Sequence, residues 1–300
     1  MTYAYARAIA SPWFSSPQGC GDAATGLTGA SGARRVAGNI RIGVGGWTFA
    51  PWRGVFYPKD VKQKDELAYA SRHLTAIEIN GTYYSTFKPD SWKKWRDETP
   101  EGFVFAVKGS RFTTNRRELA GAGESLERYF GQGVAELGER LGPFLWQLPH
   151  TKKFDAADLE GFFSLLPKEL NGIPLRHALE PRHDSFCNPA YPALLRKHGI
   201  ANVYAKHGRY PEIADLSTDF VYARLQTGED SVETAYPPAE LDGWAARLKS
   251  WAAGDAPEGL PLVDKEYGSP KTPRDVFCFI IHEGKIRAPA GAMALIERCK

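Results

Sequence analysis

Short apolar runs alternate with amphipathic segments along the chain from Asn39 onward. The apolar runs predict strands over residues 40–45, 75–80, 103–108, 143–148, 174–180, 201–206, 219–226 and 275–281. The amphipathic segments predict helices over 62–73, 89–98, 124–140, 155–166, 188–199, 238–253 and 289–299. The run 144–148 is almost continuously apolar, which is typical of a strand that is covered on both faces.

This order of strands and helices predicts an α/β protein with a mostly parallel sheet. Eight strands within about 260 residues favour a closed, TIM-like (β/α) barrel over an open doubly wound sheet. One crossover is incomplete, because only a short loop around Tyr210 separates the strands at 201–206 and 219–226. We therefore expect one or more crossover helices to be degenerate. The segment Pro257–Pro273 is rich in Pro, Gly and charge, and we interpret it as a surface insertion.

The pattern assigns residues 40–300 to a single barrel domain and sets residues 1–39 apart. That first segment is rich in Gly, Ala and Ser, has Asp22 as its one acidic residue and shows no sustained periodicity. We interpret it as a disordered extension or as the product of a translation start placed too far upstream. An acid-poor targeting segment is the alternative.

Composition narrows the classes of partner. The formal net charge is +3, from 38 basic and 35 acidic residues, which is too mild to predict a nucleic-acid or membrane partner. No apolar run approaches the roughly 20 residues that span a bilayer. The four cysteines show no CxxC spacing, so we expect free thiols and a cytoplasmic location, with a disulfide pair as the alternative. The oligomeric state is left open.

Polar residues gather where the predicted strands end. In the run 76–80, Ile77 and Ile79 alternate with Glu78 and Asn80, so the two polar side chains share one face. The other strand ends supply Gly46, Trp47, Tyr83, Tyr84, Lys108, Arg111, Gln147, Glu180, Arg182, His183, Lys206, His207, Arg224, Gln226, His282 and Glu283. Because the carboxyl ends of barrel strands meet at one mouth, we expect these residues to share a pocket.

The charged members suggest catalytic roles, each with a structural alternative. Glu78 and Glu180 suit general acid and base work, or else form buried ion pairs. Lys108 ends an apolar run, which suits a base or Schiff-base nucleophile, or else it is a counter-ion. Arg182 and Arg224 suit bidentate binding of a carboxylate or phosphate, and salt bridges to the two glutamates are the alternative.

The remaining members suggest ligand contacts. The turn 43–46 could bind an anion through its backbone N–H groups, or it could simply be a tight turn into the barrel. Trp47, Tyr83 and Tyr84 could stack on a sugar or base, or pack at the rim. No resident cofactor is predicted, since no HExxH or zinc-finger spacing occurs. A divalent metal stays open, with Glu78, Glu180, His183, His207 and His282 as its ligands from separate strands.

Together these segments resemble the domain of unknown function 72, or YecE-like, family. The resemblance begins near Ile40 and rests on IGVGGWTFAPWRGVFYP, IEINGTYYSTFKPDSWKKW, FVFAVKGSRFTTN, LGPFLWQLP, ALEPRHDSF and DFVYARLQ. It implies a TIM-like barrel and no established activity. It carries over as motif positions Gly46, Trp47, Glu78, Asn80, Tyr83, Lys108, Arg111, Gln147, Glu180, Arg182, His183 and Arg224.

The chain departs from the family pattern at three places. Asn115 stands where the family commonly has His, and Pro181 stands where an aromatic residue usually separates Glu from Arg. The last strand ends in His282, where the family usually shows Asn. These departures put roles at Asn115 and at the end of the last strand in doubt, whereas Glu78, Lys108 and Glu180 are intact.

We therefore predict an enzyme that acts on a small sugar-like or phosphorylated substrate by general acid/base chemistry. Its partner would be a small anionic or polyhydroxylated molecule. Two alternatives use the same pocket. One is a small-molecule binding barrel without chemistry, and the other is a metal-dependent phosphoesterase or nuclease, which rests on fold analogy.

Overall fold

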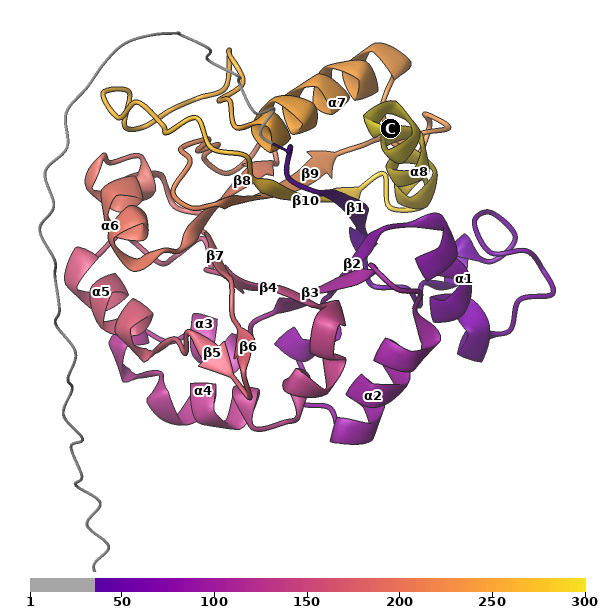
Figure 1. Ribbon diagram of the computed structural model, residues 1–300, viewed down its shortest axis with the longest axis horizontal. Helices are drawn as coiled ribbons and strands as arrows, with labels where there is room; N and C mark the ends of the chain where they lie inside the picture. The colour runs from indigo at the N-terminus through magenta and orange to yellow at the C-terminus, as the bar shows by residue number, and fades with distance from the viewer. Residues whose placement is uncertain (1–35) are drawn as a thin grey trace, which may run out of the picture. The chain divides into compact units, whose positions relative to one another are not determined.

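Eight parallel strands close into a barrel in the computed structural model, which describes residues 36–300 (Figure 1). The strands are β1 (Ile40–Gly45), β2 (Ala76–Ile79), β3 (Val104–Lys108), β4 (Leu141–Gln147), β7 (His177–Glu180), β8 (Ala201–Lys206), β9 (Phe220–Thr227) and β10 (Asp275–Glu283). The first and last strands pair in parallel and complete the ring. The predicted TIM-like barrel is confirmed.

Helices surround the ring of strands (Figure 1). They are α1 (Glu66–His73), α2 (Pro89–Glu98), α3 (Arg111–Thr114), α4 (Gly123–Phe130), α5 (Ala156–Leu165), α6 (Ala190–His198), α7 (Pro238–Ala253) and α8 (Ala288–Cys299). Residues 207–219, all of which are described, contain no helix, so the expected degenerate crossover lies between β8 and β9. No helix in the described range is long and apolar enough to cross a membrane.

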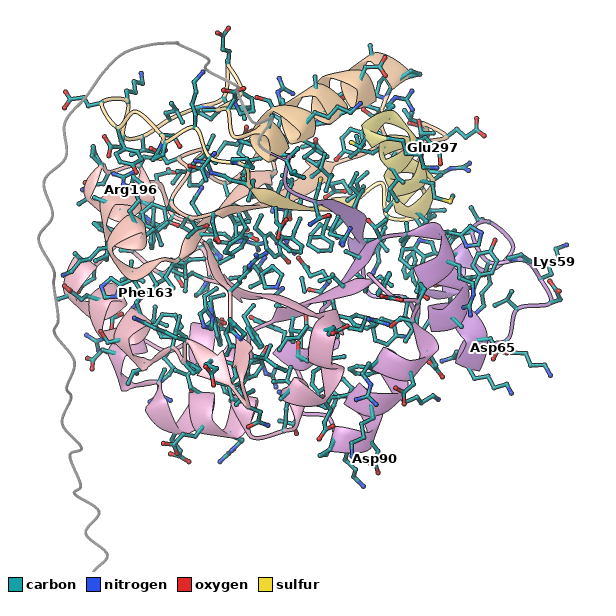
Figure 2. The ribbon with its side chains drawn as sticks, viewed as in Figure 1. Lys59, Asp65, Asp90, Phe163, Arg196 and Glu297 are labelled. Atoms are coloured by element: carbon teal, nitrogen blue, oxygen red, sulfur yellow. The ribbon has the colours of Figure 1, made fainter. Side chains whose placement is uncertain are left out.

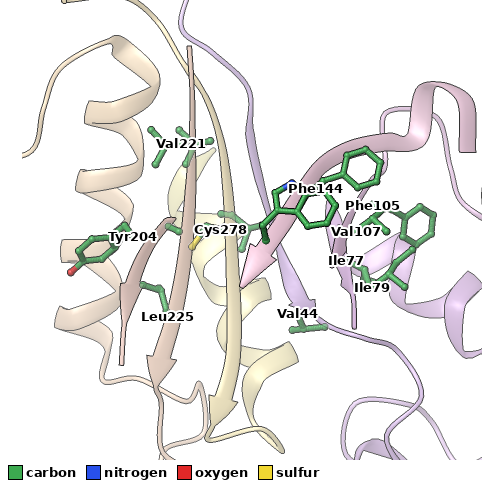
Figure 3. Close-up of a cluster of buried hydrophobic side chains, with 14 of the residues drawn as sticks. Val44, Ile77, Ile79, Phe105, Val107, Phe144, Tyr204, Val221, Leu225 and Cys278 are labelled. Carbon is green, nitrogen blue, oxygen red and sulfur yellow. The ribbon is translucent and has the colours of Figure 1, made fainter. Parts of the chain in front are cut away.

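Two apolar layers hold the barrel. The larger layer lies between strands and helices, and Figure 3 shows its strand residues, among them Ile77, Phe105 and Leu225. The smaller layer includes Tyr222 and Phe279, whose ring centroids are 5.2 Å apart. Neighbours along a strand alternate between the two layers, as pleating requires. Figure 2 shows that side chains fill the ring of strands. Charged residues such as Lys59, Asp90 and Glu297 lie at the periphery.

The smaller layer faces the interior and sets the position of the polar residues above it. Three of its members are the small residues Ala76, Ala106 and Ala178, which leave room for larger side chains from β9 and β10. Two residues further along their strands, on the same face, stand Glu78, Lys108 and Glu180. The interior therefore changes from apolar to charged in one step toward the carboxyl ends.

Two predicted elements were wrong. The helix expected over 124–140 is instead α4 followed by a 3₁₀ segment, η5 (Val134–Arg140), because the chain turns at Gly133 with φ +95°. The strand expected over 174–180 begins only at His177. Its first residue, Pro174, instead belongs to β6 (Ile173–Pro174), which pairs with β5 (Glu169–Leu170) in a small antiparallel hairpin joined by Asn171-Gly172 at positive φ.

The described range begins at residue 36 and includes the last residues of the predicted N-terminal extension. Most of the predicted extension, residues 1–35, lies outside the described residues, as does the side chain of His282. Gly38 and Asn39 are described, and their backbone N–H groups donate hydrogen bonds to the Ala252 carbonyl and to Asp275. Cys187, Cys278 and Cys299 are free thiols.

A buried histidine joins the start of β7 to the surrounding structure. The indole N–H of Trp146 donates to Nδ1 of His177 at 3.2 Å, and His177 Nε2 lies 2.7 Å from the Pro167 carbonyl oxygen. These contacts require a neutral ring that carries its proton on Nε2. Burial lowers the pKa of His177 to about 4, although the bond to Pro167 acts in the opposite direction.

This histidine predicts a pH-dependent stability. Between pH 6.5 and 4, His177 is protonated in the unfolded chain but stays neutral in the folded protein. The free energy of unfolding therefore falls as the pH falls through this range. The contribution of His177 should lower the free energy of unfolding, measured by urea denaturation, by about 2 kcal/mol from pH 7 to pH 5. His177→Gln should flatten that slope, and His150→Gln, at an exposed histidine, should keep it. Equal slopes in all three proteins would contradict the assignment.

Candidate active site

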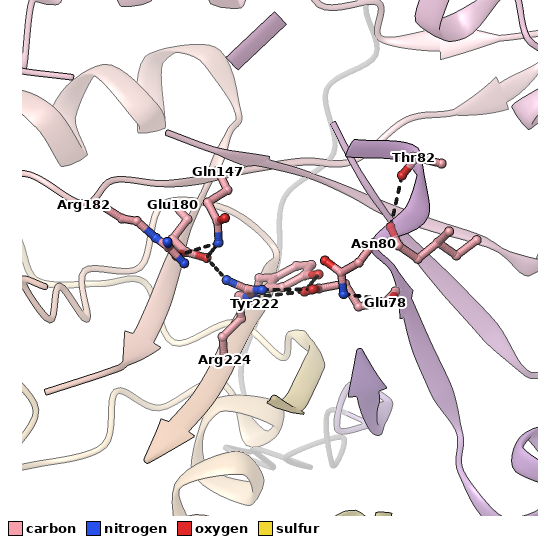
Figure 4. Close-up of polar contacts among 9 residues, drawn as sticks. Glu78, Asn80, Thr82, Gln147, Glu180, Arg182, Tyr222 and Arg224 are labelled. Atoms are coloured by element: carbon pink, nitrogen blue, oxygen red, sulfur yellow. Dashed lines mark hydrogen bonds and ion pairs between the residues drawn. The ribbon is translucent and has the colours of Figure 1, made fainter. Parts of the chain in front are cut away.

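The polar residues at the carboxyl ends of the strands are linked through Arg224 on β9 (Figure 4). Arg224 Nε and Nη2 each donate to one oxygen of the Glu78 carboxylate on β2, both at 3.0 Å. The Tyr222 hydroxyl donates to the same carboxylate at 2.7 Å. Glu78 is fully buried and Arg224 is 4% exposed. The pair is therefore a bidentate ion pair inside the barrel.

The same guanidinium group also binds Glu180 on β7 through Nη1. Two further donors reach Glu180: Arg182 Nε at 2.8 Å, and Gln147 Nε2 at 3.0 and 3.1 Å from the two oxygens. Burial alone raises the pKa of Glu180. The charges of Arg224 and Arg182 and the hydrogen bonds outweigh it and lower the pKa to about 2.

These contacts show that both carboxylates are held in buried ion pairs. Two guanidinium groups, from Arg224 and Arg182, balance Glu78 and Glu180. Buried charges persist only when they are paired and hydrogen-bonded in this way. The salt-bridge alternative therefore holds for both glutamates, and Glu180 stays ionised at neutral pH.

Lys108 differs from the other charged groups of the site. Its Nζ lies 4.7 Å from the centre of the Tyr83 ring, and it makes no hydrogen bond or ion pair with any described residue. The hydroxyls of Thr82 and Tyr129 donate to its backbone carbonyl at 2.6 and 3.0 Å and fix the strand end. Burial and then the charge of Arg224 lower the pKa of Lys108 to about 8.

The ion-paired residues Glu78, Glu180, Arg182 and Arg224 form a charged layer inside the barrel. A cavity of about 540 Å³ adjoins this charged layer. Its lining residues are Gly45, Trp52, Asn80, Tyr84, Lys108, Gln147, Arg182, Arg224, Gln226, Ile280, Ile281, Glu283, Lys285 and Ala288. A Cβ at Gly45 would lie 2.8 Å from both Asn80 Nδ2 and Ile281 Cγ2, so a larger residue here would displace these two side chains. The lining combines cations and amides with an apolar wall, which suits a small oxygen-rich ligand.

A second cavity of about 500 Å³ lies beside the first, and Tyr84 lines both. Tyr84 and Phe112 are each 63% exposed. The Arg111 guanidinium lies 5.9 Å from the Tyr84 ring centre and 5.3 Å from that of Phe112. Arg111 and Tyr84 therefore form a rim outside the charged layer.

The structure gathers only some of the predicted residues at the cavity. Asn80, Tyr84, Lys108, Gln147, Arg182, Arg224, Gln226 and Glu283 line it, and Glu78 and Glu180 bind the Arg224 that lines it. Trp47 instead packs against Trp95 at 5.1 Å, and His183 caps the 3₁₀ turn η6 (Asp184–Phe186) by accepting from Ser185 N–H. The predicted residues outside the lining also include Gly46, Tyr83, Arg111, His207 and Lys206, whose amine instead pairs with Glu212 at 2.8 Å.

Some contributors were not predicted as site residues. Tyr222 was missed, although it stands two residues before Arg224 and thus on the same face. Trp52, Lys285 and Ala288 reach the cavity from connecting segments and α8, which strand ends do not reveal. In the described part of the chain, no three His, Cys, Asp or Glu side chains are grouped to hold a metal ion. A divalent metal stays a prediction.

Fold and site together define a parallel α/β barrel protein with a polar cavity at the carboxyl ends of its strands. The chain belongs to the family described as "Protein of unknown function DUF72", whose model matches residues 41–300. The resemblance inferred from the motifs is thereby confirmed. Membership assigns no reaction, so function has to be argued from the cavity itself.

Relatives and solved structures agree with this membership. The chain is 28% identical to UPF0759 protein YecE of Escherichia coli (strain K12) over 142 residues, 46% of this chain and 48% of that protein. It is 28% identical to UPF0759 protein YunF of Bacillus subtilis (strain 168) over 160 residues, 51% of this chain and 54% of that protein. The matches thus span about half the length of these curated relatives.

The solved structures support the fold alone. A DUF72 family protein from Thermotoga maritima is 23% identical, with a TM-score of 0.62, and the alignment covers 86% of this chain and 97% of that one. One from Enterococcus faecalis is 14% identical, also with a TM-score of 0.62, covering 88% and 98%.

The charged layer predicts a large stability difference between two arginine substitutions. Arg224→Met leaves Glu78 without a cation and should lower the free energy of unfolding by about 3–5 kcal/mol in urea denaturation. The control is Arg298→Met, which removes an exposed pair with Asp242 and should cost at most about 1 kcal/mol. Adding Glu78→Gln to Arg224→Met should restore part of the loss. Similar losses for Arg224→Met and Arg298→Met would contradict the account.

Proposed function

We propose that this protein is an enzyme that acts on a small anionic, polyhydroxylated substrate in the 540 Å³ cavity, with Lys108 as the proton-transfer group. The observation that carries the proposal is the state of the Lys108 amine. It reaches the cavity from the end of β3, has no hydrogen-bond acceptor among the described residues, and has its pKa lowered to about 8. A group poised near the working pH is suited to acid/base catalysis.

Lys108 fits this role better than the glutamates do. Glu180 has a pKa of about 2, and Glu78 receives hydrogen bonds from Arg224 and Tyr222. Glu180 is therefore a poor proton donor and a weak base at neutral pH, and the oxygens of Glu78 are occupied by these hydrogen bonds. The glutamates instead hold Arg224, whose charge helps lower the pKa of Lys108. They thus support the chemistry indirectly.

The charges around Lys108 come from several strands. The groups that influence its pKa are Arg224 on β9, Glu78 on β2, Glu180 on β7 and Arg182 just after β7. The two glutamates favour the protonated amine, whereas burial and the two arginines disfavour it. Because the latter effects dominate, the neutral amine is accessible slightly above neutral pH, as a general base requires.

The lining of the cavity supports the proposed substrate class. Arg182 and Arg224 are balanced by the two buried glutamates, which leaves Lys108 and Lys285 facing one acidic lining residue, Glu283. This excess of positive charge favours an anionic substrate. The amides of Asn80, Gln147 and Gln226 add groups that can donate to and accept from hydroxyls.

A binding barrel without chemistry is the second candidate. It is favoured by the complete pairing of the two carboxylates, which makes the charged layer a rigid support. It shares the cavity and ligand class with the enzyme and differs only in what Lys108 does. The metal-dependent alternative stays a prediction that elemental analysis would test.

The proposal predicts a specific pH–rate profile. Wild-type protein would be incubated with a panel of sugar phosphates, and turnover followed by ³¹P and ¹H NMR. For the substrate found, kcat/KM should rise with pH and level off above about pH 8, as the Lys108 amine loses its proton. Lys108→Arg keeps the charge but cannot release the proton, so kcat/KM should fall by about 10²–10⁴-fold.

The matched control is Lys93→Arg, a half-exposed lysine on α2, which should retain full activity. A folded Lys108→Arg protein with wild-type kcat/KM would contradict the proton-transfer role. Saturable binding of the panel without any turnover would favour the binding barrel instead.

A further inference from the structure

We infer that Gln226 binds the substrate directly, through a side-chain amide N–H that is reserved for an uncharged oxygen of the substrate, a hydroxyl or carbonyl. The inference rests on the proposed function, since it takes the 540 Å³ cavity as the substrate site. It adds a specificity-determining residue, and it assigns the hydroxyl-bearing part of the substrate to the wall formed by β9, β10 and α8.

The position of Gln226 follows from the strand. It stands two residues after Arg224 on β9, so its side chain emerges on the same inward face. It is 1% exposed and lines the cavity. Its Nε2 atom is buried and has no hydrogen-bond partner among the described residues.

A buried amide without a partner is costly, and two other glutamines show how the chain normally avoids this cost. Gln147 Nε2 donates to Glu180. Gln132 donates from Nε2 to the Tyr129 carbonyl at 2.7 Å, and its Oε1 accepts from Phe87 N–H at 2.9 Å. Both are satisfied within the protein, whereas Gln226 is not.

The unpaired atom belongs to a residue that lines the cavity. Several other buried side-chain atoms in the described part lack a hydrogen-bond partner, including Trp92 Nε1 and Trp251 Nε1, but they lie away from the lining. Gln226 Nε2 is the one that belongs to a lining residue. The unpaired donor therefore belongs to the wall of the proposed substrate site.

The surroundings of Gln226 indicate what it binds. The lining of the cavity includes the apolar residues Ile280, Ile281 and Ala288 from β10 and α8, along with Arg224, which the two glutamates occupy. An amide is neutral, so the anionic part of the substrate is left to Lys108 and Lys285, and the amide suits a hydroxyl or carbonyl oxygen. A buried donor of this kind discriminates strongly against analogues that lack the oxygen, because it would stay unpaired.

The first experiment needs no ligand. Gln226→Met removes an unsatisfied amide and keeps most of the volume, so thermal denaturation should show an unchanged or higher Tm. The control, Gln132→Met, removes an amide that is already satisfied and should lower the Tm by about 2–4 °C. An equal loss of Tm in both variants would overturn the inference, because Gln226 would then already be satisfied in the free protein.

The second experiment measures binding by calorimetry, with D-glucose 6-phosphate and inorganic phosphate as probes. Gln226→Met should weaken binding of the sugar phosphate at least about tenfold, the effect of one buried hydrogen bond, and leave phosphate binding within about twofold. Gln132→Met should bind both probes like the wild type. Unchanged sugar phosphate affinity in Gln226→Met, equal weakening for both probes, or no binding of the sugar phosphate by the wild type would overturn the inference.

These outcomes can be separated from those that test the proposed function. If Lys108→Arg keeps full turnover while Gln226→Met loses sugar phosphate affinity, the proton-transfer role fails and the role of Gln226 holds. If Lys108→Arg is inactive while Gln226→Met binds normally, the role of Gln226 fails and the enzyme proposal holds.

Discussion

The guanidinium group of Arg224 holds the polar layer of the barrel together. It extends from β9 to carboxylates on β2 and β7, so a single side chain connects three separated positions in the ring of strands. Each of these charges would be unstable alone in the interior, and together they are balanced and hydrogen-bonded. The small residues Ala76, Ala106 and Ala178 below them provide the space in which this layer forms.

This arrangement determines which groups remain available for a ligand. Glu78 and Glu180 are occupied by arginine, and Gln147 is occupied by Glu180. Among the lining residues, the amines of Lys108 and Lys285 and the amide nitrogen of Gln226 have no hydrogen-bond partner among the described residues. Burial, and then the charge of the Arg224 that the carboxylates hold, shift the pKa of Lys108 toward neutrality, although the two glutamates act in the opposite direction. Structural ion pairing and the proposed chemistry thus depend on one network.

Much of this organisation could be predicted from the sequence, because it follows from local periodicity. Alternating strands and helices predict the barrel, and parallel strands bring the ends of β2, β3, β7 and β9 to one mouth. The sequence does contain local signals against the two wrong elements. Asn171-Gly172 is typical of a tight hairpin just before the strand expected over 174–180. The glycines around Gly133 interrupt the helical pattern over 124–140.

Other features depend on tertiary contacts that no local pattern contains. Trp47 packs against Trp95 from another element, and His183 binds its own turn, although both residue types are common in binding sites. Likewise, the sequence does not show that Gln226 lacks a partner while Gln132 and Gln147 have one. Which polar residues are satisfied can be determined only after the chain is folded.

The most direct test of the central claim is an NMR titration of the Lys108 side-chain nitrogen in ¹⁵N-lysine-labelled protein, assigned with Lys108→Arg. The account predicts a pKa of about 8 for this amine, well below that of the exposed lysines. A pKa above about 10, the ordinary value for lysine, would contradict it, because Lys108 would then be a permanent cation and no candidate for proton transfer.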